Sequence, residues 1–166
     1  MIQHNSSQLL LRPARHLDIP LILQFIQQLA DYEKLSHEAV ATEALLNEHL
    51  FGPVPSAEVL IAEWDKTPAG FALYFRTFST FLGRPGLYLE DLYVKPEFRG
   101  QGIGRSLLTH LAQIAVARGY GRLDWAVLNW NDPAIRFYDS LGATPLEEWT
   151  GYRLTGKALT QLAVAR

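Results

Sequence analysis

Three glycines alternate with other residues in the segment Arg99-Gly100-Gln101-Gly102-Ile103-Gly104, which follows an apolar, strand-like run. Glycine lacks a Cβ atom, so the backbone N–H groups of such a loop can turn toward one point. A helix beginning there adds its unpaired amides and the positive end of its dipole. Apolar residues then recur at helical spacing, at Ile103, Leu107, Leu111 and Ile114. The segment therefore predicts a strand, a phosphate-binding loop and a helix anchored to a core.

Two well-known phosphate loops do not match this segment. The dinucleotide fingerprint reads Gly-x-Gly-x-x-Gly directly after a strand, and the nucleoside triphosphate loop ends in Gly-Lys-Ser/Thr, whereas Gly104 is followed by Arg105 and Ser106. The segment resembles instead the acyl-CoA loop of the GNAT acyltransferase superfamily, Arg/Gln-x-x-Gly-x-Gly/Ala, which the chain matches from Arg99 to Gly104. The alternative is a plain strand-to-helix turn, but such a turn needs one glycine rather than three.

Composition limits the classes of protein that this chain can form. Its 166 residues are 48% apolar, which suits a single domain over residues 1–166. A formal net charge of −2 leaves no basic surface to attract nucleic acid. The chain has no cysteine, which excludes disulfides, thiolate metal ligands and a cysteine nucleophile. No stretch approaches the ~18 apolar residues of a membrane span, and no apolar signal region precedes the first strand, so we expect a cytoplasmic protein without a membrane partner.

Other catalytic chemistries find no support in the sequence. The histidines are scattered and show no paired ligand spacing, so we expect no metal site. A Gly-x-Ser-x-Gly elbow, which would present a serine nucleophile, does not occur. The histidines are His4, His16, His37, His49 and His110.

Turn signals and apolar periodicity divide the chain into strands and helices. Asp18 and Pro20 predict the start of one helix, Thr42 that of a second, and Asp132 and Pro133 that of a later one, with Asp132 as its N-cap. The order predicts an α/β fold, with a mixed, mostly antiparallel sheet flanked by helices. The expected strands are residues 9–12, 59–62, 71–75, 87–94, 122–128 and 149–154, with a turn over 65–70, and the last helix is expected over 157–164.

Five sequence blocks extend the resemblance to nearly the whole chain. Within the GNAT superfamily the chain is most similar to the diamine (spermidine/spermine) and thialysine N-acetyltransferase branch. The matching blocks are residues 29–33, 88–91, 98–104, 126–131 and 137–138. The resemblance implies a GNAT-like sheet with a splayed pair of central strands, acetyl-CoA as co-substrate, and a homodimer. It also implies direct acetyl transfer to a primary amine of a small molecule.

The same resemblance implies where acetyl-CoA lies. Its pantetheine would pair with the edge of the strand at residues 92–94, where this strand and the one around Val127 splay apart. Asn131 has an alternative role as a helix cap, because Asn and Asp before Pro are ordinary helix starts. The implied cofactor contacts are Leu92, Tyr93, Val94, Arg99, Gly100, Gln101, Gly102, Ile103, Gly104, Arg105, Asn131, Pro133, Ala134 and Tyr138.

Glu90 and Asp91 are adjacent on an otherwise apolar strand. Pleating points them to opposite faces, so at least one carboxylate must leave water. The functional interpretation is that Glu90, partly desolvated, becomes basic enough to accept a proton from the substrate ammonium, directly or through water. The alternatives are a bulge that turns both carboxylates outward, or a pairing with an arginine such as Arg76.

Tyr138 is the candidate general acid. It follows Ala134 by one helical turn and Asn131 by two, so the three share a helix face. A phenol can protonate the leaving thiolate with modest tuning of its acidity, and the Phe-Tyr pair of the resembling family carries this role. The alternative is a core aromatic beside Phe137.

The expected acceptor is a small molecule with a primary amine, because several carboxylates would attract a cation. The polyamine-acetylating members carry further acids where this chain has Thr80 and Asn129, which are neutral. Arg84 could hold a substrate carboxylate, so we expect a thialysine-like or lysine-like amino acid rather than spermidine. Two further hypotheses are a non-catalytic acyl-CoA sensor and a protein amine acetyltransferase. The expected substrate contacts are Tyr32, Glu33, Glu90, Asp91, Arg84 and Trp125.

Overall fold

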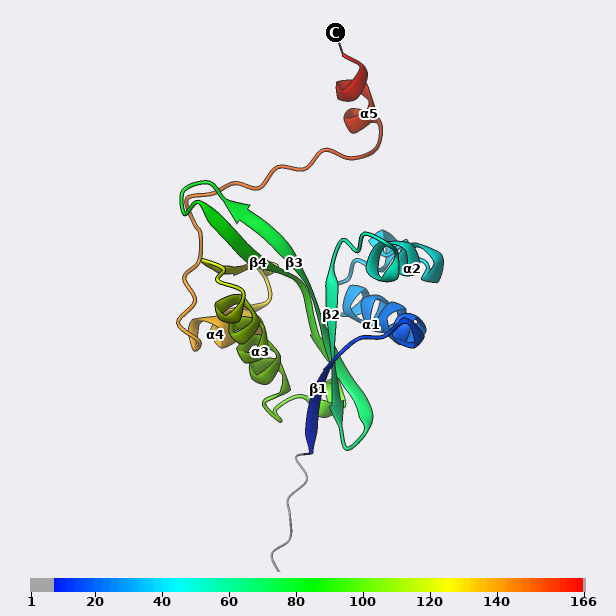
Figure 1. Ribbon diagram of the computed structural model, residues 1–166, viewed down its shortest axis with the longest axis vertical. Coiled ribbons are helices and arrows are strands. Elements are labelled where there is room, and N and C mark those ends of the chain that lie inside the picture. The colour runs from blue at the N-terminus through cyan, green and yellow to red at the C-terminus, as the bar shows by residue number, and fades with distance from the viewer. Residues whose placement is uncertain (1–7, 166) are drawn as a thin grey trace, which may run out of the picture. The chain divides into compact units, whose positions relative to one another are not determined.

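The computed structural model describes residues 8–165. These form two compact units, one that ends at Leu128 and one that begins at Asn129. Each unit has its own elements, coloured along the chain in Figure 1.

The first unit is built on a five-stranded sheet in the order β1-β2-β3-β4-β5. The first four strands form an antiparallel meander, and β5 lies parallel to β4. The mixed α/β fold with a mostly antiparallel sheet is therefore confirmed. The strands are β1 (Leu9–Pro13), β2 (Glu58–Trp64), β3 (Thr67–Ser79), β4 (Arg84–Val94) and β5 (Leu123–Trp125).

The turn between β2 and β3 is shorter than expected. The sequence predicted a turn over 65–70, because Pro68 and Gly70 interrupt the apolar pattern, but β3 already begins at Thr67. Only Asp65 and Lys66 connect the strands, with φ angles of 48° and 67°. Two consecutive left-handed residues give the backbone twist that matches a tight β-hairpin.

Helices cover both faces of this sheet. Figure 1 shows α1 and α2 on one side and α3 on the other. Against α1, the rings of Phe25 and Phe71 stack with centroids 5.3 Å apart. On α3, the side chains of Leu107 and Leu111 are fully buried. The helices are α1 (Ile19–Tyr32), α2 (Glu43–Phe51) and α3 (Ile103–Ala117), with 3₁₀ turns at His16–Asp18, Ser36–Glu38 and Pro96–Phe98.

The two helix starts predicted in the first unit are found, with a change of role at Asp18. Thr42 caps α2, since its side chain accepts a hydrogen bond from the Leu45 N–H at 3.3 Å. Asp18 holds the N-cap position of α1 without a side-chain cap bond. Its carboxylate instead accepts two hydrogen bonds from Arg12, at 2.7 and 2.9 Å.

The second unit contains α4 (Asp132–Asp139) and α5 (Gly156–Val164). The N-cap of α4 is Asn131, one residue before the expected Asp132. The expected strand over 149–154 is wrong, because these residues form neither strand nor helix. The residues described from Asn129 onward form no strand, so this segment finds no strand to pair with in its own unit. Its Trp149 and Tyr152 are 72% and 95% exposed.

Candidate functional site

Strands β4 and β5 pair over only three residues and then part. Leu89 and Trp125 form the last pair, and β5 ends there, well before residue 128, where the sequence predicted its end. β4 continues to Val94, and in this stretch it pairs with β3 on one side. Within residues 8–165, no strand covers the other edge of β4 from residue 90 to 94. Such an edge offers backbone N–H and C=O groups to an extended ligand.

A β-bulge marks the place where the strands part. Leu73 of β3 lies opposite Asp91 and Tyr74 lies opposite Leu89, so Glu90 is an extra residue on β4. Directly opposite residues share a face of the sheet. Leu73 packs against the core beneath α1, which places Asp91 on that face. Tyr74 lines a cavity together with residues of α3, which places Leu89 on the other face.

The bulge decides which carboxylate is buried. We expected Glu90 to be the partly desolvated group, and this is wrong, because Glu90 is exposed whereas Asp91 is half-buried. Burial is the largest cause that raises the pKa of Asp91, to about 6, and the negative charges of Glu90 and Glu33 raise it further. Burial also raises the pKa of Glu33, which directly follows α1. The structure thus brings Glu33 and Glu90 within electrostatic reach of Asp91.

The glycine loop joins β4 to α3. Gly100 and Gly102 have φ angles of 76° and 77°, which L residues rarely adopt. A Cβ atom added to either glycine would meet nothing within 4 Å, so the space beside them is open. Gly104 is already helical, so the three glycines do not share one role. The Ser106 N–H bonds to the Gly102 carbonyl, which leaves the earlier amides, such as that of Ile103, outside the helical ladder. This loop fits a phosphate group.

Arg99 contacts residues of both β4 and α1. Its Nε donates a hydrogen bond to the Val94 carbonyl at 3.0 Å. Its guanidinium carbon lies 4.7 Å from the ring centroid of Tyr32 and 6.0 Å from that of Tyr93. We expected Arg99 only as a cofactor contact. The contact with Tyr32 was missed, because no local pattern links residues so far apart in the sequence.

The candidate residues of the second unit lie on α4. Asn131 is buried, and its Oδ1 accepts a hydrogen bond from the Ala134 N–H at 3.4 Å, so the capping role is observed. Pro133 lies in the first turn. The ring of Tyr138 lies 5.4 Å from that of Phe137, and Tyr138 is half-buried.

Two further candidates lie on the sheet. Trp125 is directly opposite Leu89, at the level where the bulge begins. Arg84 is the first residue of β4 and precedes Glu90 by six residues, which is about 20 Å of extended chain. Trp125 therefore lies beside the bulge but on the face of Leu89, opposite to that of Asp91, and Arg84 of the same chain lies away from the acidic cluster.

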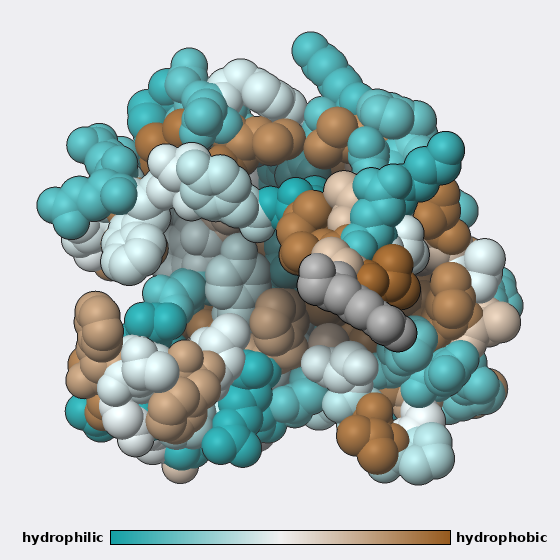
Figure 2. Space-filling model, turned by 90° about the horizontal axis from the view of Figure 1, so that it is seen from above, coloured by the Kyte–Doolittle hydropathy of each residue, from teal (hydrophilic) through white to brown (hydrophobic). Residues whose placement is uncertain are grey.

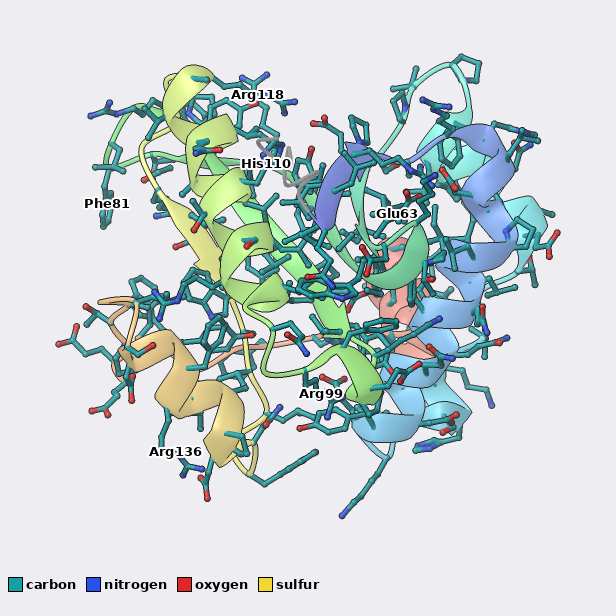
Figure 3. All side chains as sticks on the ribbon, turned by 90° about the horizontal axis from the view of Figure 1, so that it is seen from below. Glu63, Phe81, Arg99, His110, Arg118 and Arg136 are labelled. Atoms are coloured by element: carbon teal, nitrogen blue, oxygen red, sulfur yellow. The ribbon has the colours of Figure 1, made fainter. Side chains whose placement is uncertain are left out.

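A cavity of about 370 Å³ lies elsewhere in the first unit. Its wall includes His110 on α3 and Arg118 directly after that helix, both labelled in Figure 3, and none of the expected site residues lines it. Within residues 8–165, no three His, Asp or Glu side chains are grouped so that they could hold a metal ion. No helix in this range is long and apolar enough to cross a membrane.

A mixed sheet, a glycine loop at the start of a helix and an open strand edge beside it are the features expected of a GNAT acyltransferase. A family model described as the Acetyltransferase (GNAT) family matches residues 24–143. The chain belongs to this family of enzymes, as the glycine loop and its flanks predicted, and GNAT acetyltransferases use acetyl-CoA as co-substrate.

Named relatives cover most of the chain. Thialysine N-epsilon-acetyltransferase of Bos taurus is 40% identical over 165 residues, which cover 93% of this chain and 96% of that protein. An L-ornithine N5-acetyltransferase of Arabidopsis thaliana is 32% identical over 194 residues, covering 90% and 85%. Among solved structures, an integron cassette protein from the mobile metagenome of V. cholerae has a TM-score of 0.81 at 29% identity, covering 96% of this chain and 100% of that one.

Proposed function

We propose that the protein moves an acetyl group from acetyl-CoA to a primary amine of a small molecule, with a thialysine-like or lysine-like amino acid preferred over spermidine. The observation that carries this proposal is the half-buried carboxyl group of Asp91, with Glu33 and Glu90 within electrostatic reach, beside the open edge of β4. Thialysine and ornithine, named for the relatives, are both amino acids with a side-chain amine, which supports the same class of acceptor.

The proposed cofactor contacts are those that the family resemblance implies, and the open glycine loop and strand edge of the first unit support them. Acetyl-CoA supplies an acetyl group activated as a thioester. The loop at residues 100–104 and Arg105 hold its phosphates through backbone amides and charge. The edge of β4 at residues 92–94 pairs with its extended arm. The family resemblance adds Asn131, Pro133 and Ala134, at the start of α4, as further contacts.

The acidic cluster receives the amine. Glu33, Glu90 and Asp91 attract the substrate ammonium, which must lose a proton before its nitrogen can attack. A carboxylate with a pKa of about 6 is a competent proton acceptor near neutral pH. Asp91 therefore holds the ammonium and takes its proton, and the exposed Glu90 passes the proton to water.

Tyr138 is the general acid that protonates the leaving thiolate. As the new N–C bond forms and the C–S bond breaks, the Oη of Tyr138 gives its proton to the leaving sulfur. No covalent enzyme intermediate is required, because the chain has no cysteine and no activated serine is evident.

We further propose that the chain is a single-domain enzyme that acts in the cytoplasm as a homodimer. Apolar side chains are exposed on the β3–β4 hairpin, among them Phe78 at 60% and Phe81 at 95%, and Figure 3 shows Phe81 at its outer end. Figure 2 also shows apolar residues, in brown, exposed among hydrophilic ones. Arg84 lies on this hairpin, too far from its own acidic cluster, so a substrate carboxylate would meet Arg84 of a second copy. Light scattering that finds a monomer at working concentration would contradict this.

The deciding experiment is an acetyl-CoA consumption assay across polyamines, diamines and amino acids with side-chain amines. We expect thialysine or lysine to give the highest kcat/KM, and Arg84→Ala to remove the preference for amino acids. A best rate with spermidine or spermine would refute the acceptor assignment. Binding of acetyl-CoA without turnover of any amine, peptides included, would favour the sensor hypothesis, and turnover of peptides alone would favour a protein amine acceptor.

A further inference from the structure

The segment at residues 95–99, between β4 and the glycine loop, is attached to α1 at two points. The Nζ of Lys95 lies 5.6 Å from the ring centroid of Phe25, in the middle of the helix. The guanidinium of Arg99 lies 4.7 Å from the ring of Tyr32, the last residue of the helix. A cation over an aromatic face is attracted by the negative potential of the ring. The glycine loop is therefore mounted on α1 as well as on β4.

Arg99 makes the tighter of these attachments. It has a second anchor, the hydrogen bond from its Nε to the Val94 carbonyl, and it also lies over the ring of Tyr93. The end of α1 favours a cation at this place, because the last carbonyls of a helix carry partial negative charge. Figure 3 shows Arg99 where the segment after β4 lies beside α1.

The two ends of this contact belong to different binding regions. Arg99 immediately precedes Gly100, where the phosphates would bind, and Tyr32 immediately precedes Glu33, which interacts electrostatically with Asp91. We propose that Arg99 is a positioning residue that couples the glycine loop to the acceptor segment at Tyr32 and Glu33. Because this contact joins the loop to the end of α1, a ligand that restrains one of them also restrains the other, and the second ligand then binds at a lower entropic cost. This inference rests on the proposed function.

Calorimetry with CoA and thialysine tests this coupling without turnover. The dissociation constant of CoA is measured alone and with saturating thialysine, and we expect a decrease of about fivefold, within the usual range of coupling between sites. Arg99→Gln keeps N–H donors but removes the charge, and it should reduce the effect to less than twofold. Tyr32→Leu should do the same, and the double variant should lose nothing more.

Two control variants separate coupling from folding. Tyr32→Phe keeps the ring and should keep the fivefold effect. Lys95→Gln removes a cation from the same segment, but one that contacts α1 two turns before Tyr32, and it should also keep the effect. If Arg99→Gln proves unstable by thermal unfolding, Tyr32→Leu tests the same contact from its other side.

The outcomes distinguish this inference from the function on which it rests. If both ligands bind and neither changes the affinity of the other, the coupling is refuted while the acetyltransferase assignment stands. If Arg99→Gln and Tyr32→Leu both retain the fivefold effect, the coupling exists but does not run through this contact, and the role of Arg99 is refuted. If CoA does not bind at millimolar concentration, the proposed function itself fails.

Discussion

Leu73 and Asp91 stand directly opposite each other across β3 and β4, so a carboxylate lies in line with apolar side chains that pack under α1. Such a carboxylate loses hydration on folding, and two further acids, Glu33 and Glu90, add repulsion. The carboxylates of the acidic cluster should therefore favour binding of a cation but lower the stability of the protein when no cation is bound.

Asp91→Asn should make the protein more stable at pH 8. The pKa of Asp91 is raised from 3.8 to about 6 in the folded state, so the folded protein binds this proton more tightly than the unfolded chain. The free energy of unfolding therefore falls between about pH 4 and pH 6, by up to about 3 kcal/mol for this shift. Urea unfolding at pH 4 and pH 8 should show this decrease for the wild type but not for the variant, which should also lose turnover. Glu90→Gln removes one of the charges that raise the pKa of Asp91, so it should reduce this decrease without abolishing it.

Tyr138→Phe should lower kcat roughly a hundredfold, because a positioned acid contributes at least this much. The dissociation constant of acetyl-CoA should stay within about twofold, since only a hydroxyl group is removed. Stopped-flow or steady-state rates measure the first quantity and calorimetry the second. Tyr152→Phe, in the same unit and 95% exposed, serves as the control. A Tyr138→Phe enzyme with the wild-type kcat would remove this residue from the mechanism.

Gly102→Ala should weaken acetyl-CoA binding about tenfold. An alanine at a φ of 77° is strained by roughly 1 kcal/mol, and its Cβ would enter the open space where the phosphates are proposed to lie. Gly119→Ala is a matched control, because Gly119 has a φ of 69° and equally open surroundings beyond the other end of α3. Both variants should lose similar stability in urea unfolding, but only Gly102→Ala should lose affinity. Equal affinities for CoA would place the phosphates elsewhere.

The ion pair between Glu58 and Arg118 predicts a small stabilisation that depends on pH. Arg118 donates two hydrogen bonds to the Glu58 carboxylate, at 2.5 and 2.8 Å, and this pairing lowers the pKa of Glu58. The stabilisation should be present above pH 4.5 and disappear as the pH falls below the lowered pKa. Because both side chains are more than a third exposed, Arg118→Met should cost only about 0.5–1 kcal/mol at pH 7.

The matching control is Glu58→Gln, which removes the charge of the acid and leaves Arg118 in place. Urea unfolding of the two single variants and the double variant at pH 7 isolates the interaction between the two side chains. A destabilisation by Arg118→Met that is as large at pH 3 as at pH 7 would show that packing of the arginine stem is responsible instead.

Sequence patterns predicted those parts of the molecule whose cause is local. α1 and α3 could be predicted because one face of each helix is apolar at helical spacing. The capping role of Thr42 could be predicted because a cap depends only on the residues next to it. Gly100 and Gly102 were readable because few other residues adopt a positive φ. The bulge at Glu90 was not, because the extra residue is defined only against the register of β3. For the same reason, the sequence assigned the burial of Asp91 to its neighbour.

Distance along the chain explains the other differences. The contact between Arg99 and Tyr32 joins residues with no shared local pattern. The segment at 149–154 has the composition of a strand, but strand formation also requires a partner edge, which composition does not report. The turn residues Asp65 and Lys66 are neither Gly nor Asn, which are the usual signals of a tight hairpin, so the sequence did not predict a two-residue turn.

Because of the bulge in β4, substitutions at alternate residues of this strand affect different faces of the sheet, whereas in a regular strand they would all affect the same face. Leu87, Leu89, Asp91 and Tyr93 alternate without interruption in the sequence, yet Leu89 faces α3 and Asp91 faces α1. A substitution before the bulge therefore repacks one layer of the sheet, and a substitution two residues later repacks the opposite layer. Substitutions under α1 can thus change the acceptor region proposed there without altering the layer of the sheet that supports the glycine loop.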